Sequence, residues 1–266
     1  MNILSIDIGI KNLAYIHTIY CKNTSKIDII SWDSINLTNS NYICCDCKNN
    51  AKYGIDNIYY CNKHAKKTNY KILDYKINQF KKKSLKELIN FSKEYDISFN
   101  NNLNTHDKKL YIIDSIQSKF LSCIEIENTN NISLIDIGIN INKMFNKLFT
   151  TQFDLILIEN QISPKANRMK TIQGMVAQYF INKNIDNILF ISSCNKLKPF
   201  VNKKKTTYNE RKKLSIEITY KILEKLNIDK NLIEYFKSNK KKDDLADCFM
   251  QNISHLILNY NFSIDI

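Results

Sequence analysis

The chain has 266 residues and a formal net charge of +13, from 39 lysines and arginines against 26 aspartates and glutamates. This length accommodates one large domain, or a domain with an inserted module, and excludes a short disulfide scaffold. The positive charge suits a polyanionic partner such as nucleic acid. An ordinary basic surface explains the same charge, so the composition alone does not identify the partner.

The beginning of the sequence lacks the charged start and apolar run of a signal peptide, and no apolar segment approaches the length of a membrane span. We therefore expect a soluble, intracellular protein. In that setting the 8 cysteines are expected to be thiols or metal ligands rather than disulfides.

Residues 3–10 predict a first strand on which Asp7 points away from the apolar face. Gly9, two residues later, would let a backbone or a phosphate come close. Further strands over residues 13–20 and 27–32 would complete an antiparallel meander. The apolar face of the first strand consists of Leu4, Ile6, Ile8 and Ile10.

The composition then becomes rich in Asn and Lys, which predicts an insertion over residues 38–131 between two parts of one domain, 1–37 and 132–266. Within it, residues 41–67 form a predicted zinc-binding module, because two closely spaced pairs of soft ligands suit tetrahedral Zn²⁺. Cys45 is a competing ligand in the first pair. The alternative to a zinc site is a set of cysteines that bind no metal. The predicted structural zinc ligands are Cys44, Cys47, Cys61 and His64.

The second part of the insertion, residues 84–124, has two apolar helix faces joined by an extended link. This layout resembles the SAP-type DNA-binding motif. A plain helical hairpin that supports the zinc module is the alternative.

After the insertion, the pattern predicts a helix over residues 134–148 and a central strand over 154–161 that carries Glu159 at its carboxyl end. Acids at that end of a strand often take part in chemistry. Further elements are expected at 164–182 (a helix with Pro164 in its first position), 188–192 (a strand) and 208–226 (a helix).

The last helix places Asp244 and Asp247 on one stripe, with an apolar stripe opposite, and Asp243 on the flank in a capping role. Together with Asp7 and Glu159, these two acids form a predicted group of four on rigid elements. Crowded carboxylates repel each other unless a proton or a cation intervenes. Two Mg²⁺ (or Mn²⁺) ions about 4 Å apart would satisfy them and could hydrolyse a phosphodiester.

The order of these acids resembles the RNase H-like superfamily, and specifically the RuvC-like Holliday junction resolvases of the large-DNA-virus (poxvirus) type. The matching segments are residues 7–14, 158–161 with 167–169, and 242–247. The implied fold is α/β, with an RNase H-like mixed five-stranded sheet flanked by helices and an inserted zinc-binding and helical module.

The resemblance implies a magnesium-dependent endonuclease that cuts four-way DNA junctions as a homodimer paired through the helix 164–182, with Asp7, Glu159, Asp244 and Asp247 as metal ligands. A viral replication site in the host cell is the implied location. Lys196 or Lys198 resembles a family lysine near the scissile phosphate. The candidate DNA contacts, each of which could equally be a solvated side chain, are Arg168, Lys170, Lys196, Lys198, Lys203, Lys204 and Lys205.

Two other functions fit the same residues. Metal-bound carboxylates do not choose the substrate, so a nuclease for RNA–DNA hybrids is one alternative. The other is a non-catalytic, zinc-containing nucleic-acid-binding or transcription factor built on the same fold.

Overall fold

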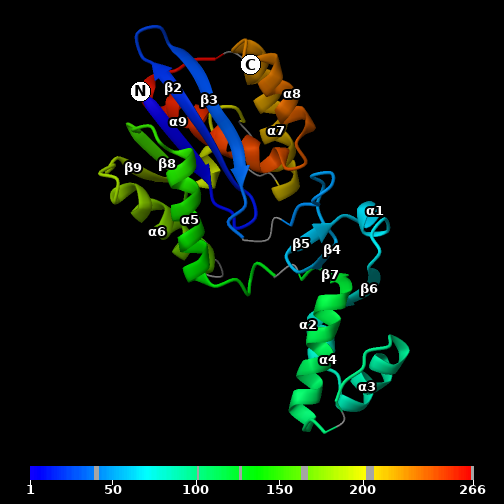
Figure 1. Ribbon diagram of the computed structural model, residues 1–266. Helices are drawn as coiled ribbons and strands as arrows, with labels where there is room; N and C mark the ends of the chain where they lie inside the picture. Colours follow the sequence, from blue (N-terminus) through cyan, green and yellow to red (C-terminus); the bar gives the residue numbers. More distant parts are fainter. Residues whose placement is uncertain (39–41, 101, 126–127, 163–166, 202–206, 265–266) are drawn as a thin grey trace. The chain divides into compact units, whose positions relative to one another are not determined.

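A computed structural model describes residues 1–38, 42–100, 102–125, 128–162, 167–201 and 207–264. The chain forms two compact units. Unit 1 comprises Met1–Asn39 and Thr129–Ile266, and unit 2 comprises Ser40–Asn128 (Figure 1). Unit 2 occupies the part of the chain where the sequence predicts an insertion.

Unit 1 is built on a five-stranded sheet in the order β3-β2-β1-β8-β9. Strands β1, β2 and β3 form an antiparallel meander, whereas β8 runs parallel to β1 and β9 runs parallel to β8. This mixed five-stranded sheet confirms the predicted RNase H-like fold. The strands are β1 (Asn2–Asp7), β2 (Leu13–Cys21), β3 (Lys26–Ile35), β8 (Leu155–Glu159) and β9 (Ile188–Ile191).

Helices cover both faces of this sheet (Figure 1). One face packs against α5 (Leu134–Leu148) and α6 (Asn167–Ile181), and the other packs against α7 (Tyr208–Lys225), α8 (Lys230–Ser238) and α9 (Lys242–Tyr260). Strand alternation explains the division, because Leu4 and Ile6 enter the α5–α6 core while Ile3 enters the α7–α9 core. Both faces of β1 are therefore buried, and the strand is rigidly held.

Helix α9 differs from the predicted amphipathic helix, because every side chain from Leu245 to Leu256 except that of Asp247 is buried. Buried polar residues of the helix are bonded to the sheet: Gln251 donates to Ser5, and Asn252 donates to Thr18 on the neighbouring strand. The predicted capping role of Asp243 is wrong. The helix starts after Lys241 without a side-chain cap, and Asp243 instead pairs with Lys212 on α7.

Two further differences concern helices of unit 1. The short α8 was not predicted; it is capped by the Asp229 side chain, which accepts a hydrogen bond from the backbone N–H of Asn231. The helix expected over 164–182 is described from Asn167 to Ile181, and Pro164 lies outside the described residues.

Unit 2 contains a four-stranded sheet, β5-β4-β7-β6, that the sequence did not predict. Its strands have only three to six residues, too few to show a clear period. One of them begins at Phe120, inside the segment 84–124 for which two helices were expected. The elements are β4 (Tyr53–Ile55), β5 (Ile58–Tyr60), α1 (Asn62–Ala65), β6 (Lys71–Lys76), α2 (Ile77–Lys81), α3 (Leu85–Glu94), α4 (Thr105–Lys119) and β7 (Phe120–Cys123).

Within the described ranges, no helix is both long enough and apolar enough to cross a membrane.

Candidate active site and candidate metal centre

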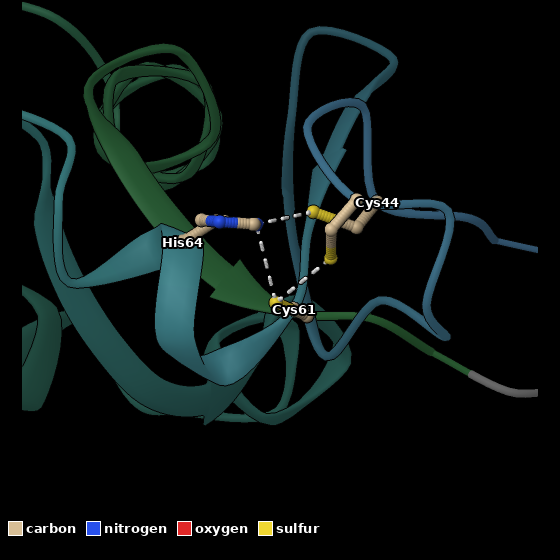
Figure 2. A group of neighbouring side chains, drawn as sticks. Cys44, Cys61 and His64 are labelled. Carbon is tan, nitrogen blue, oxygen red and sulfur yellow. Dashed lines mark hydrogen bonds between the residues drawn. The ribbon is translucent and has the colours of Figure 1, made fainter.

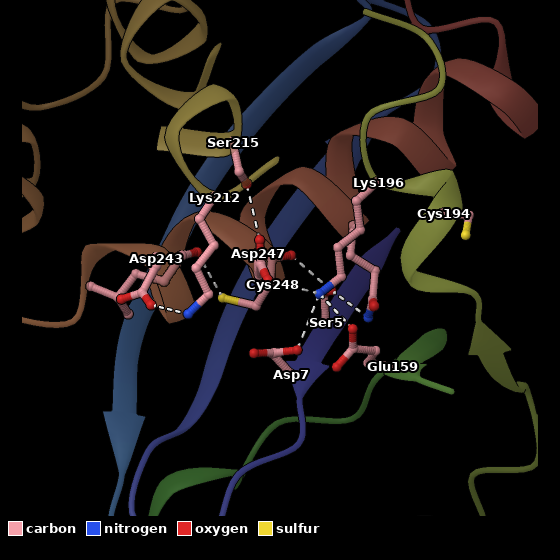
Figure 3. Close-up of polar contacts among 12 residues, drawn as sticks. Ser5, Asp7, Glu159, Cys194, Lys196, Lys212, Ser215, Asp243, Asp247 and Cys248 are labelled. Carbon is pink, nitrogen blue, oxygen red and sulfur yellow. Dashed lines mark hydrogen bonds and ion pairs between the residues drawn. The ribbon is translucent and has the colours of Figure 1, made fainter. Parts of the chain in front are cut away.

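Three of the four predicted acids meet at one edge of the unit 1 sheet (Figure 3). Asp7 is the last residue of β1 and Glu159 is the last residue of β8. Because these strands are parallel neighbours, their carboxyl ends lie side by side. Asp247 reaches the same place from the beginning of α9.

A single ammonium group marks the point where these carboxylates converge. Lys196 Nζ lies 3.1 Å from Asp7 Oδ1, 3.0 Å from Glu159 Oε1 and 3.4 Å from Asp247 Oδ2. Its side chain is only 5% exposed. Lys196 directly follows the short 3₁₀ helix η2 (Ser193–Asn195), and its carbonyl oxygen accepts a hydrogen bond from Ser254 on α9. The lysine is therefore fixed at both its backbone and its side chain.

The electrostatics of this group follow from burial and charge. Burial raises the pKa of Asp7 well above its usual value, with the charges of Glu159 and Asp247 acting in the same direction and Lys196 opposing them. For Lys196, burial favours the neutral amine, but the three carboxylates outweigh it and the pKa is raised. For Glu159, burial is outweighed mainly by the Lys196 charge, and the pKa is lowered. Lys196 thus remains protonated, and its charge favours the ionised form of Glu159.

Neighbouring polar groups orient two of the carboxylates. Gln161 Nε2 donates to Glu159 Oε2 at 3.1 Å, and Ser215 Oγ on α7 donates to Asp247 Oδ1 at 3.0 Å. In both cases the other carboxylate oxygen faces Lys196. Gln161 lies at the end of the matching segment 158–161, but the sequence analysis gave it no role. Ser215 lies in no matching segment, because its role depends on a contact between two separate helices.

Gly9 serves the turn that follows Asp7. A Cβ at this position would lie 2.2 Å from the carbonyl oxygen of Asn12, which is closer than any side chain tolerates. The close approach expected at Gly9 is therefore made by the chain's own backbone, as β1 turns into β2.

The fourth predicted acid, Asp244, lies next to the other three. Asp244 lies one turn before Asp247 on α9, and its pKa is raised by burial and by the adjacent charge of Asp243. Among the described ion pairs of Lys196, none involves Asp244. The acid cluster consists of Asp7, Glu159 and Asp247, with Asp244 beside it.

The candidate DNA-contacting residues differ in their exposure and in their partners. Lys170 and Lys198 are exposed, and the guanidinium of Arg168 donates to the carbonyl oxygen of Ile132. Lys196 is engaged by the acid cluster. Lys203, Lys204 and Lys205 lie outside the described residues.

The donor set of the acid cluster fits a divalent cation. Its ligand atoms are carboxylate oxygens, which hard cations such as Mg²⁺ prefer. Three carboxylates against one ammonium leave an excess of two negative charges when all are ionised. The Lys196 ammonium shows that this point already accommodates a positive group.

A second group of potential ligands lies in unit 2. Cys44, Cys47, Cys61 and His64 place one ligand atom each within 4.8 Å of one another, and such a group could hold a metal ion. Figure 2 shows Cys44 and Cys61 turned toward the His64 ring. Cys45 is not in this group; its thiol is directed to Asp46 Oδ1.

Three of the distances within the group match those of a tetrahedral zinc site. His64 Nδ1 lies 3.4 Å from Cys44 Sγ and 3.6 Å from Cys61 Sγ, and Cys47 Sγ lies 3.7 Å from Cys61 Sγ. Ligands at the usual Zn–S and Zn–N lengths sit about 3.5–3.8 Å apart at the corners of a tetrahedron.

The chemistry of Cys44 also suits a metal ligand. Desolvation works against its thiolate, but backbone hydrogen bonds at Cys61 and Asp46 outweigh it and lower the pKa of Cys44 to about 6. A thiolate is the form that binds metal.

The sheet order, with acids at the ends of two adjacent parallel strands and on the closing helix, defines an RNase H-like nuclease fold. Comparison with known families is consistent with this class. The family model "Mitochondrial resolvase Ydc2 / RNA splicing MRS1" matches residues 3–171, and the model "Poxvirus A22 protein" matches residues 101–259. The chain belongs to this family of resolvases, of the poxvirus type, which confirms the resemblance found in the sequence.

Individual relatives are more distant. The chain is 27% identical over 318 aligned positions to the uncharacterized protein L451 of Acanthamoeba polyphaga mimivirus, covering 96% of this chain and 74% of that protein. A crystal structure of Fowlpox virus resolvase with Holliday junction DNA shares 15% identity, with a TM-score of 0.45 and coverage of 97% of this chain and 98% of the other. The yeast mitochondrial Holliday junction resolvase Ydc2 also shares 15% identity, with a TM-score of 0.43 and coverage of 98% and 83%.

Proposed function

We propose that this protein is a structure-selective endonuclease that resolves four-way DNA junctions by metal-assisted hydrolysis of phosphodiesters. The observation that carries the proposal is the convergence of Asp7, Glu159 and Asp247 on one cationic group at the edge of the sheet. Membership of the resolvase family supports the choice of substrate.

In this proposal Asp7, Glu159 and Asp247, with Asp244 beside them, hold two Mg²⁺ or Mn²⁺ ions. Such ions, when bound, activate water and stabilise the leaving oxygen of a phosphodiester. The chain itself fixes the acids on β1, β8 and α9 and orients Glu159 through Gln161. Lys196, protonated because of its carboxylate neighbours, balances their charge and is placed to donate to a phosphate oxygen.

We further propose a homodimer that pairs through α6 and the adjoining α5. A four-way junction has near two-fold symmetry, so a two-fold dimer would present one acid cluster to each of two opposed strands. Exposed apolar side chains on these helices support the surface: Ile181 is 50% exposed, Ile139 59% and Ile135 73%.

Unit 2 would contribute a structural Zn²⁺ held by Cys44, Cys47, Cys61 and His64, and its helical segment 84–124 would contact DNA. On unit 1 the proposed phosphate contacts are Arg168, Lys170, Lys196 and Lys198, with Lys203, Lys204 and Lys205. A replication site in a virus-infected cell remains the proposed location.

A substrate panel tests the proposal. The protein is incubated with Mg²⁺ and, separately, a four-way junction, the matching linear duplex, and an RNA–DNA hybrid of the same sequence. We expect symmetric nicks in the junction and little cleavage of the other two. Preferential cutting of the hybrid would establish the ribonuclease alternative. Binding of any of these substrates without cleavage under Mg²⁺ or Mn²⁺ would establish the non-catalytic one.

A further inference from the structure

A cavity of about 210 Å³ opens beside the acid cluster, and both acidic and basic side chains line it. Glu159, Lys196 and Asp247 of the cluster are part of the lining. The first turns of α7 contribute Arg211, Lys212 and Ser215. Figure 3 shows Lys212 and Ser215 extending from α7 toward α9. The sequence patterns drew no attention to these three residues.

Helix α7 is tied to α9 at two points along this wall. Ser215 donates to Asp247, and Lys212 pairs with Asp243 one turn earlier on α9. Ser215 is 2% exposed, so α7 is closely packed at this point. Before these residues, Thr207 and Glu210 form a capping box that defines where the helix begins. The position of residue 211 relative to the acids is therefore set by the packing of two helices.

Arg211 differs from its neighbour Lys212, which pairs with Asp243. Within the described part of the chain, no carboxylate forms an ion pair with the Arg211 guanidinium. The side chain is exposed and lines the cavity. A guanidinium offers a planar fork of donors that matches two oxygens of a phosphate.

We infer that Arg211 is the phosphate anchor of the active-site cavity, held in place by the contacts of Lys212 and Ser215 with α9. Its ligand is a backbone phosphodiester of the nucleic acid whose scissile bond lies at the acid cluster. The acids repel a polyanion, and a guanidinium that lines the same cavity offsets that repulsion where the strand must enter. This inference rests on the proposed function.

The test compares Arg211→Gln with Lys213→Gln, which removes the same charge from the same helix. Lys213 is exposed and does not line the cavity. Because it comes two residues after Arg211, its side chain leaves the helix at about 200° from that of Arg211. Both changes are made in an Asp7→Asn background, so that binding is measured without cleavage. Affinity for a fluorescent four-way junction is titrated at several KCl concentrations.

We expect Arg211→Gln to weaken binding about 5- to 10-fold at 0.1 M salt and to reduce the slope of log affinity against log salt by about one. Lys213→Gln should change affinity less than about 2-fold, and Arg211→Lys should fall between, since it keeps the charge but loses the fork. Equal effects of Arg211→Gln and Lys213→Gln would overturn the anchor while leaving the proposed function intact. If the Asp7→Asn parent itself fails to bind the junction, the proposed function fails and the anchor fails with it.

Discussion

The side-chain amide nitrogen of Gln251 lies 3.1 Å from the hydroxyl oxygen of Ser5, and the Ser5 hydroxyl in turn donates to the carbonyl oxygen of Cys248 at 2.9 Å. This pair joins α9 to β1 within the buried core. Ser5 is two residues before Asp7, and Gln251 is one turn after Asp247. The contact therefore sets the distance between two acids of the cluster.

Replacing Gln251 by Leu should weaken both the fold and the active site. The change leaves the Ser5 hydroxyl without one of its partners and removes buried hydrogen bonds, at a cost of about 1–3 kcal/mol in the free energy of unfolding. Because α9 loses its tie beside Asp7, we also expect slower single-turnover cleavage of a junction per folded molecule. Urea unfolding and rapid-quench kinetics measure the two effects.

Asn252→Leu is the matched control for that variant. Asn252 is equally buried on α9 but bonds to Thr18 on β2, away from the acids. The Asn252→Leu variant should lose about as much stability as Gln251→Leu, while its folded fraction cleaves at a rate near that of wild type. Equal loss of rate in both variants would show that Gln251 acts only through stability.

Replacing Lys196 by Met should make the protein depend on divalent metal for stability. Removing one partner of a buried ion pair typically costs about 3–5 kcal/mol, and here three carboxylates would lose their common counter-ion. We expect a lower Tm at pH 8 without divalent metal, and a larger rise in Tm on adding Mg²⁺ than wild type shows. Lys198→Met, at an exposed position, should behave as wild type. An equal Mg²⁺ response in all three proteins would contradict a metal site at Lys196.

Stability should fall as the pH drops below about 6.5, in part because of buried histidines. Burial lowers the pKa of His17 and of His255, so the folded state binds their protons less readily than the unfolded chain. The contribution of each histidine to the free energy of unfolding is complete above the pKa that it has in the unfolded chain. It is lost as the pH falls toward the lower pKa of the folded state, by at most about 1.4 kcal/mol per pH unit for each histidine. Urea unfolding between pH 7.5 and 5.5 should show a shallower slope for His255→Gln than for wild type. An unchanged slope would exclude His255 as a source of this pH dependence.

The double variant Cys44→Ser, Cys61→Ser should lose bound zinc and destabilise unit 2, because two of the four ligands are removed. Mass spectrometry under native conditions would measure the metal content, and limited proteolysis would report on the unit. Cys45→Ser should keep its zinc, since that thiol points away from the group. Zinc retained in the double variant would refute the assigned ligands.

The sequence predicted the elements that carry a strong period or a sharp local signal. The apolar positions from Leu134 to Leu148 predicted a helix, and the structure has α5 there, because the apolar stripe is continuous over four turns. Asp7 and Glu159 were recognisable because each ends a buried strand. The small sheet of unit 2 was missed because its short strands pair between distant segments, as β4 does with β7.

The surroundings of the acids were harder to predict for a related reason. Lys196 was selected as a candidate DNA contact, but its position among three carboxylates depends on elements more than 150 residues apart in the chain. Ser215 and Arg211 carry no motif, and their relation to the acids exists only once α7 packs on α9. Helix α9 was predicted to be amphipathic because the sequence does not distinguish a polar residue that is hydrogen-bonded in the core from one that is exposed to solvent.

The central claim is that the acid cluster cuts branched DNA, and the most direct measurement is cleavage of a strand-labelled four-way junction by wild type, Asp7→Asn and Glu159→Gln in Mg²⁺, with binding measured in parallel. We predict paired symmetric nicks by wild type, a loss of cleavage of at least about 100-fold in each variant, and junction affinity within a few-fold of wild type in all three. Cleavage by either variant at a rate near that of wild type would contradict the account.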